Sequence, residues 1–180
     1  RHVYVHKNMG FSVRCIKNFV KDSMTDPRDG RTYKTVKIGS QTWMAENLNY
    51  KTERSSCLEN TDSNCTKFGR LYTWNDAMGL AGNLENSEKC DACKPRSFTY
   101  PMQGVCPVGW HLPRKQEWKT LIAVAGGEET AGGMLKARNG WRYCNGFGVF
   151  SCEHKDAYDY FGFTALSFGD SLGKRSWKFL

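Results

Sequence analysis

At residues 106–118 the chain reads CPVGWHLPRKQEW, a bent segment that leads into a helix. Pro107 and Gly109 are typical of a turn, and Pro113 suits a first helical turn, where its missing N–H costs nothing. Trp110 and Leu112 are expected to point into a core. The turn and the helix form one unit around which we expect the rest of the chain to pack.

The helix is predicted from the spacing of the apolar residues that follow. These recur at intervals of three and four, at Trp118, Leu121, Ile122 and Ala125, and give one apolar stripe. Gly126-Gly127 then ends the helix. Cys106, at the head of the unit, is well placed for a disulfide to another part of the chain.

Four further blocks occur with this unit: DGRTYKTVKIGSQTWMAENL at 29–48, GRLYTW at 69–74, GW at 140–141 and FGFTAL at 161–166. Together, and in this order, they resemble the Fibrobacter succinogenes major paralogous domain (FISUMP) family over roughly residues 29–170. The resemblance implies a secreted or surface bacterial module. It also implies an α+β fold similar to C-type-lectin-like and formylglycine-generating-enzyme-like folds. We therefore expect a loop-rich, disulfide-stapled domain with two short helices around small antiparallel sheets.

The domain prediction has three parts: a strand at 1–17, a linker at 18–30, and the main domain at 29–180 with an atypical or truncated C-terminus. Residues 10–15, GFSVRC, resemble the strand that closes the family domain, yet here they come first. They are either the tail of a preceding tandem copy or a permuted strand that packs in this chain. We favour packing in this chain, which would bury Phe11 and Val13 and bring Cys15 to Cys106.

Local patterns predict the remaining elements. Residues 33–44 alternate around Gly39-Ser40 and predict a hairpin, followed by Asn47 and Asn49 as turn or cap residues. Residues 51–68 and 83–105 are polar and irregular, and predict long loops. Thr73 is expected to cap a short helix that carries Asp76 in its first turn. A helical or turn segment at Met134 and Leu135, and short strands near 140–150, precede an aromatic-rich core segment at 158–166.

Eight cysteines in 180 residues indicate an oxidising compartment. Their spacing favours four pairs: Cys15 with Cys106, Cys57 with Cys65, Cys90 with Cys93, and Cys144 with Cys152. A zinc site at Cys90-x-x-Cys93 would need a second ligand pair at compatible spacing, and a redox motif would need a βαβ unit. The sequence shows neither, so a structural disulfide there, or two separate bridges, is favoured.

The net charge is +8, but the basic residues are scattered and interleaved with acids. Since no recognition helix or basic stripe occurs, we predict no nucleic-acid partner. A solvated basic surface with weak affinity for anionic glycans or lipopolysaccharide is the better interpretation. No apolar run is long enough to span a membrane. The chain begins at Arg1, so we expect the natural N-terminus, with any signal peptide, to lie upstream.

Trp74-Asn75-Asp76 resembles the calcium-binding triplet of C-type lectins, whose amide and carboxylate oxygens suit a hard cation. In those proteins the triplet lies near the end of the domain, whereas here it precedes residues 106–118 and begins a predicted helix. No sugar-coordinating Glu-Pro-Asn or Gln-Pro-Asp motif occurs. A capping role is favoured, and the sequence predicts no metal and no cofactor.

The sequence contains no clear motif of catalytic residues. Formylglycine-generating enzymes bind copper through paired cysteines, but no segment here matches their metal-binding motif. The histidines (His2, His6, His111 and His154) are well separated, and His111 between two apolar residues favours a structural role. A copper- and oxygen-dependent oxidase is kept as an alternative, and a non-catalytic protein is favoured.

The chain holds six tryptophans and eight tyrosines, more than its core requires. The predicted core tryptophans are Trp43, Trp74, Trp110 and Trp118. The candidate ligand-binding residues are Trp141, Tyr143, Tyr158, Tyr160 and Trp177, since exposed aromatic faces stack on sugars and are favoured at interfaces. We therefore predict an extracellular or cell-surface recognition or adhesion module that binds a polysaccharide or a surface protein. A structural tandem-repeat domain without its own ligand is the alternative.

Overall fold

The computed structural model describes residues 10–17, 22–80, 99–139, 143–144, 152–153 and 157–166. For residues 143–144 and 152–153 it describes the backbone. Within these residues, no helix is long and apolar enough to cross a membrane.

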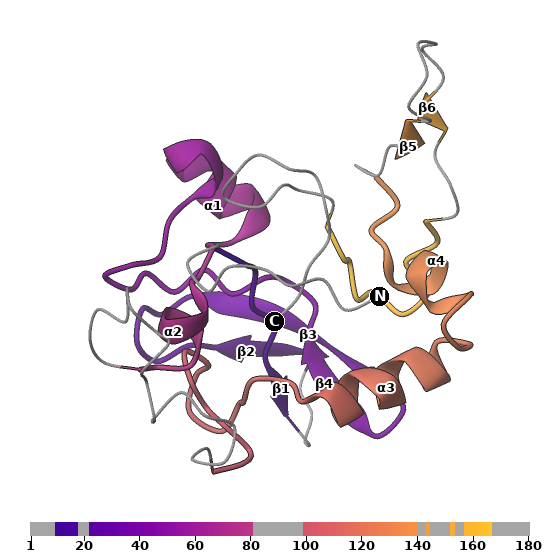
Figure 1. Ribbon diagram of the computed structural model, residues 1–180, viewed down its shortest axis with the longest axis horizontal. Helices are drawn as coiled ribbons and strands as arrows, with labels where there is room; N and C mark the ends of the chain where they lie inside the picture. The colour runs from indigo at the N-terminus through magenta and orange to yellow at the C-terminus, as the bar shows by residue number, and fades with distance from the viewer. Residues whose placement is uncertain are drawn as a thin grey trace, which may run out of the picture.

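The centre of the structure is an antiparallel four-stranded sheet in the order β1-β4-β3-β2 (Figure 1). Its strands are β1 (Ile16–Lys17), β2 (Ser23–Thr25), β3 (Thr32–Ile38) and β4 (Gln41–Met44). The predicted hairpin is confirmed, since β3 and β4 pair around Gly39-Ser40. The prediction of a linker at 18–30 is wrong for β2, which pairs with β3. The turn-forming residues between these strands connect a second hairpin, rather than separate two domains.

The N-terminal segment, residues 10–17, packs inside the fold. Phe11 forms a backbone bridge with Tyr72, and Ile16 lies between β4 and His111. Phe11 and Val13 are buried, as predicted for packing in this chain. The origin of the segment, as a tandem-copy tail or a permuted strand, stays a prediction.

Both faces of the central sheet are covered, because consecutive residues of β4 enter different clusters. Met44 joins the first cluster and Trp43 the second. The first cluster consists of Val13, Cys15, Tyr33, Met44, Leu48, Tyr72, Ala77, Val105, Cys106, Trp110 and Leu112. The second consists of Ile16, Ile38, Trp43, Leu121, Phe163 and Ala165. Leu121 comes from a helix and Phe163 from a loop, so the second cluster joins both to the sheet.

The described residues contain more helices than the two predicted. They are the 3-10 helix η1 (Leu58–Asn60), α1 (Asp62–Phe68), α2 (Trp74–Ala77), α3 (Lys115–Val124) and α4 (Ala131–Leu135). A second, two-stranded sheet pairs β5 (Tyr143–Cys144) with β6 (Cys152–Glu153). The polar segment at 51–68 is therefore not only a loop. Its helix α1 has an acid in the first turn and a base in the last, which suits the helix dipole.

The central helix α3 begins at Lys115, two residues after the predicted Pro113. Glu117 Oε2 accepts the N–H of Arg114 at 2.7 Å, and Oε1 lies 2.9 Å from His111 Nε2. Burial alone would raise the pKa of the Glu117 carboxyl. The Arg114 N–H and the His111 ring outweigh burial and hold this pKa below its ordinary value. His111 thus supports the start of α3.

Two predicted disulfides are present: Cys15–Cys106 and Cys57–Cys65. The first ties the N-terminal segment to residues 106–118, and the second closes the η1–α1 region. Cys90 and Cys93 lie outside the described residues. Cys144 and Cys152 face each other in the β5–β6 register, and a disulfide between them stays a prediction.

The four tryptophans predicted for the core differ in burial. Trp43 and Trp110 are buried, whereas Trp118 and Trp74 are half-buried. Trp118 still packs on Trp43, with ring centroids 4.8 Å apart. The prediction for Trp74 is corrected, because α2 buries Asn75 and Ala77 instead.

Candidate functional site

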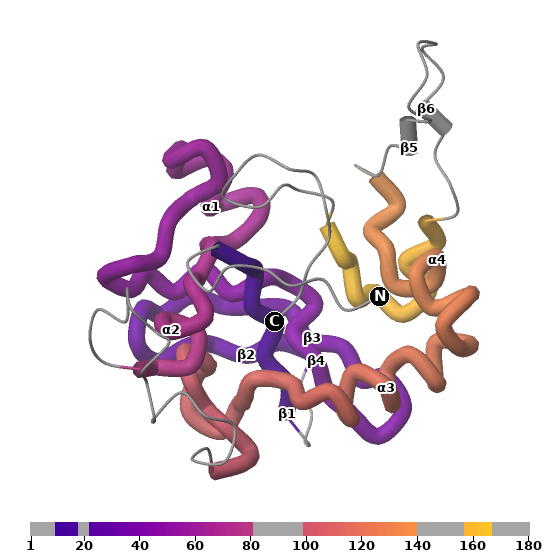
Figure 2. The backbone as a smooth tube through the Cα atoms, in the orientation of Figure 1, coloured from indigo at the N-terminus to yellow at the C-terminus, as the bar shows by residue number. Residues whose placement is uncertain are grey.

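The candidate site lies where residues 157–160 cross the end of α4. The N–H groups of Tyr158 and Tyr160 donate to the carbonyls of Gly133 and Met134, both at 2.9 Å. Carbonyls in the last turn of a helix lack partners within the helix, so the crossing segment caps α4. Figure 2 shows residues 157–166, in yellow, alongside α4. Hydrogen bonds of the backbone therefore fix where the two tyrosines stand.

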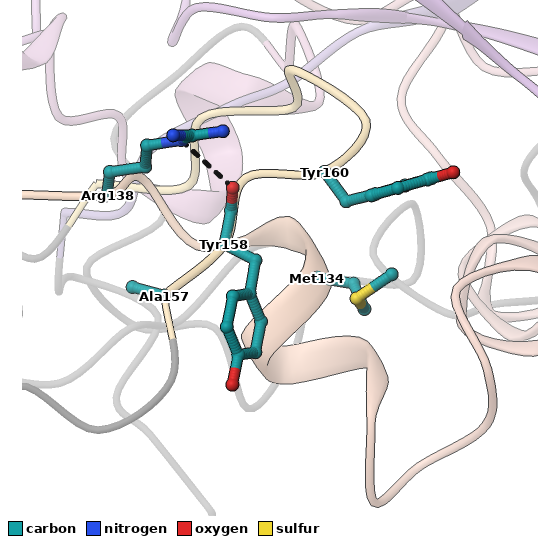
Figure 3. A pocket seen from close by; sticks show the side chains of 5 residues that line it. All are labelled: Met134, Arg138, Ala157, Tyr158 and Tyr160. Carbon is teal, nitrogen blue, oxygen red and sulfur yellow. Dashed lines mark hydrogen bonds between the residues drawn. The ribbon is translucent and has the colours of Figure 1, made fainter.

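Met134, Arg138, Ala157, Tyr158 and Tyr160 line a hollow of about 570 Å³ (Figure 3). Tyr158 and Tyr160 are 55% and 71% exposed. In Figure 3 the two rings point away from each other, with the Met134 side chain between them. The Tyr160 ring also packs edge-on against Phe161, with centroids 5.0 Å apart. The described lining thus combines two exposed tyrosines with the side chains of Met134, Ala157 and Arg138.

The side chain of Asp159, the residue between the two tyrosines, is hydrogen-bonded within the loop. The carboxylate of Asp159 accepts the Thr164 N–H at 2.7 Å and the Thr164 hydroxyl at 2.9 Å. Asp159 and Thr164 both have positive φ, at 43° and 53°, a conformation that costs free energy for residues other than glycine. The two hydrogen bonds hold this unfavourable backbone, and they keep the Asp159 carboxylate occupied within the loop.

A buried cation, the guanidinium of Arg14, is hydrogen-bonded to the loop at Phe163 and Thr164. Arg14 of the N-terminal segment is 1% exposed, and its guanidinium donates to the carbonyls of Phe163 and Thr164. It also donates to Asn47 Oδ1 at 2.8 Å, and it lies 4.6 Å from the centre of the Phe163 ring. Asn47 in turn donates to the Phe68 carbonyl at the end of α1, a capping role.

Arg14 keeps its positive charge although its side chain is buried. Burial lowers the pKa of Arg14 to about 9, while the charges of Asp159 and Glu46 act in the opposite direction. The guanidinium is therefore protonated at neutral pH. A buried charge of this kind requires hydrogen-bond partners, and the loop carbonyls supply two of them.

Sequence reasoning found part of this site. Tyr158 and Tyr160 come together as candidates, whereas only the backbone of Tyr143 is described, in β5. Trp141 and Trp177 lie outside the described residues. Met134, Arg138 and Ala157 were missed as lining residues. Nothing in the local pattern of α4 signals that a segment much later in the chain, at 157–160, lies across its end.

Thr73 caps the helix that begins with the Trp74-Asn75-Asp76 triplet, as the sequence predicted. Thr73 Oγ1 accepts the Asp76 N–H at 3.2 Å, and Thr52 donates its hydroxyl to Asp76 Oδ2 at 2.6 Å. Within the described part of the chain, no three His, Cys, Asp or Glu side chains are grouped so that they could hold a metal ion.

Comparison with known families gives one match. The model of the Fibrobacter succinogenes major domain matches residues 36–179. Comparisons with curated proteins and with solved structures found no significant match.

Proposed function

Because the chain belongs to the Fibrobacter succinogenes major domain family, we propose that it is a non-catalytic recognition or adhesion module. Its location would be the extracellular space or the bacterial cell surface. Two disulfides support this location, since such bonds persist in oxidising compartments. The antiparallel sheet, the packed helix α3 and the long irregular segments support a C-type-lectin-like fold as part of the same proposal.

The observation that carries the proposal is the hollow with two exposed tyrosines on a fixed loop. Ligand-binding hollows are lined mainly by hydrophobic and aromatic side chains with a few polar groups. Tyrosine combines a flat apolar face with a polar hydroxyl, and sugar rings combine apolar faces with hydroxyl groups. A polysaccharide is therefore the ligand class that the hollow fits best.

A surface protein is the second target, since tyrosine and arginine are also enriched where proteins bind each other tightly. Both side chains line this hollow. A domain without any ligand would leave the tyrosines without a role, and the experiment below separates these cases. An oxidase would need a reduced cysteine pair, and the four cysteines whose side chains the structure describes are all in disulfides.

The proposal is tested by a glycan array and by pull-down on insoluble cellulose and other bacterial and plant polysaccharides. The test variant is Tyr158→Ala/Tyr160→Ala. The matched control is Tyr100→Ala, because Tyr100 is 49% exposed and does not line the hollow. Two aromatic contacts at about 1 kcal/mol each predict that the double variant loses affinity roughly 30-fold.

Binding that is lost in the double variant and retained in the control supports the proposal. Equal binding by all three proteins would place the ligand elsewhere and contradict it. A flat response from every polysaccharide, together with saturable and tyrosine-dependent binding to intact cells stripped of glycans, would instead indicate a surface protein.

A further inference from the structure

The hollow carries a positive charge at a defined position. Arg138 follows α4, and its Nε donates to the carbonyl of Tyr158 at 3.1 Å, a bond drawn in Figure 3. The same residue therefore holds the aromatic loop and lines the hollow. Because Nε is already bound to the carbonyl, the guanidinium has a defined orientation. Its terminal N–H groups are the charged donors that a ligand in the hollow can reach.

Among the described residues, the lining offers no negative charge to offset this cation. None of the five described lining residues is acidic, and no carboxylate in the described part of the chain forms an ion pair with Arg138. The carboxylate of Asp159, which lies between the two tyrosines in sequence, accepts hydrogen bonds from Thr164. The chain as a whole carries +8. Long-range attraction and the local donor both favour an anion.

We infer that this hollow recognises an acidic polysaccharide, in which uronic acid carboxylates pair with Arg138 while the sugar rings contact Tyr158 and Tyr160. The inference rests on the proposed function and adds the chemical class of the ligand. A planar guanidinium matches a planar carboxylate through two parallel hydrogen bonds, which a lysine cannot reproduce. An orientation that is fixed before binding reduces the entropic cost of forming them.

The test compares polygalacturonate with its fully methyl-esterified form, which keeps the sugar rings and removes the charge. Affinities are measured by isothermal titration calorimetry in 0.15 M salt. The variant is Arg138→Gln, because glutamine removes the charge but can still donate to the Tyr158 carbonyl. The matched control is Arg31→Gln, an exposed arginine outside the hollow with the same change in net charge. Urea unfolding of both variants checks that the fold is kept.

For the unmodified protein we expect polygalacturonate to bind at least about tenfold more tightly than the ester, the effect of one charge-assisted pair. Arg138→Gln should remove this preference, and Arg31→Gln should change it less than about twofold, as screened charges do.

Three results would overturn the inference. Equal binding of the acid and the ester would refute the ligand class but leave polysaccharide recognition intact. Equal losses in the two glutamine variants would indicate general attraction by a basic surface, without a site. Absence of binding to both polymers, with no tyrosine-dependent polysaccharide found on the array, would remove the proposed function and the inference together.

Discussion

The two described disulfides should contribute unequally to stability. Cys15–Cys106 joins residues 91 positions apart, whereas Cys57–Cys65 joins residues only 8 apart. A crosslink stabilises a fold mainly by restricting the unfolded chain, and the restriction grows with the length of the closed loop. The chain-entropy relation gives about 4.6 kcal/mol for the long loop and about 2.5 kcal/mol for the short one. The two bonds should therefore differ by about 2 kcal/mol.

The comparison uses two double variants, Cys15→Ala/Cys106→Ala and Cys57→Ala/Cys65→Ala. Each removes two buried sulfur atoms, so the loss of packing is similar and largely cancels in the difference. The free energy of unfolding is measured by urea denaturation without reductant, with unmodified protein as reference. The variant without the long-range bond should have the lower midpoint.

An equal loss in the two variants, or a greater loss for the short loop, would contradict the reasoning. Such a result would mean that the N-terminal segment is not held in the core as described, because a crosslink to a detached segment restricts little. Retention of near-ultraviolet circular dichroism in both variants is the control for a folded starting state.

Two further variants test the polar contacts inside the fold. Arg14→Met should lower the free energy of unfolding by about 2–6 kcal/mol, since it leaves the carbonyls of Phe163 and Thr164 without their buried donor, at about 1–3 kcal/mol each. Urea denaturation measures this, and a loss below about 1 kcal/mol would show that the guanidinium is dispensable. Glu117→Gln should destabilise most at neutral pH. Because the folded pKa of Glu117 lies below its ordinary value of 4.5, the stabilisation by its carboxylate is present above that value and is lost as the pH falls through the lower, folded pKa. The free energies of unfolding of the variant and the unmodified protein should therefore converge as the pH is lowered from 7 to 3. A difference between them that does not change with pH would exclude an electrostatic role of Glu117.

Elements that depend on local pattern were predictable from the sequence. The β3–β4 hairpin follows from alternation around Gly39-Ser40, and α3 from apolar residues at intervals of three and four. Helix α1 was missed because it is polar on almost every side, so no apolar stripe marks it. Strand β2 was missed because the turn formers after it are equally compatible with a linker and with a hairpin turn.

The burial of Arg14 shows why alternation can mislead. In residues 11–15 the apolar side chains fall on one side, so Ser12 and Arg14 are expected to face solvent. The structure buries all five, and the loop at 163–164 covers Arg14. Charge within such a segment is normally a sign of exposure. Here the covering element comes from 149 positions further along the chain, beyond the reach of any local pattern.

The same covering element explains how an irregular loop can carry the proposed binding surface. Residues 157–165 form no regular sheet or helix along most of their length, so their backbone groups lack the partners that a ladder would supply. Arg14 binds two of these carbonyls, Asp159 binds the Thr164 N–H, and α4 accepts the N–H groups of both tyrosines. With the polar groups of the backbone satisfied from three directions, the loop can hold Tyr158 and Tyr160 outward without a packed core around their rings. The buried cation is therefore part of the proposed binding site in a physical sense, since it orders the exposed surface before any ligand arrives.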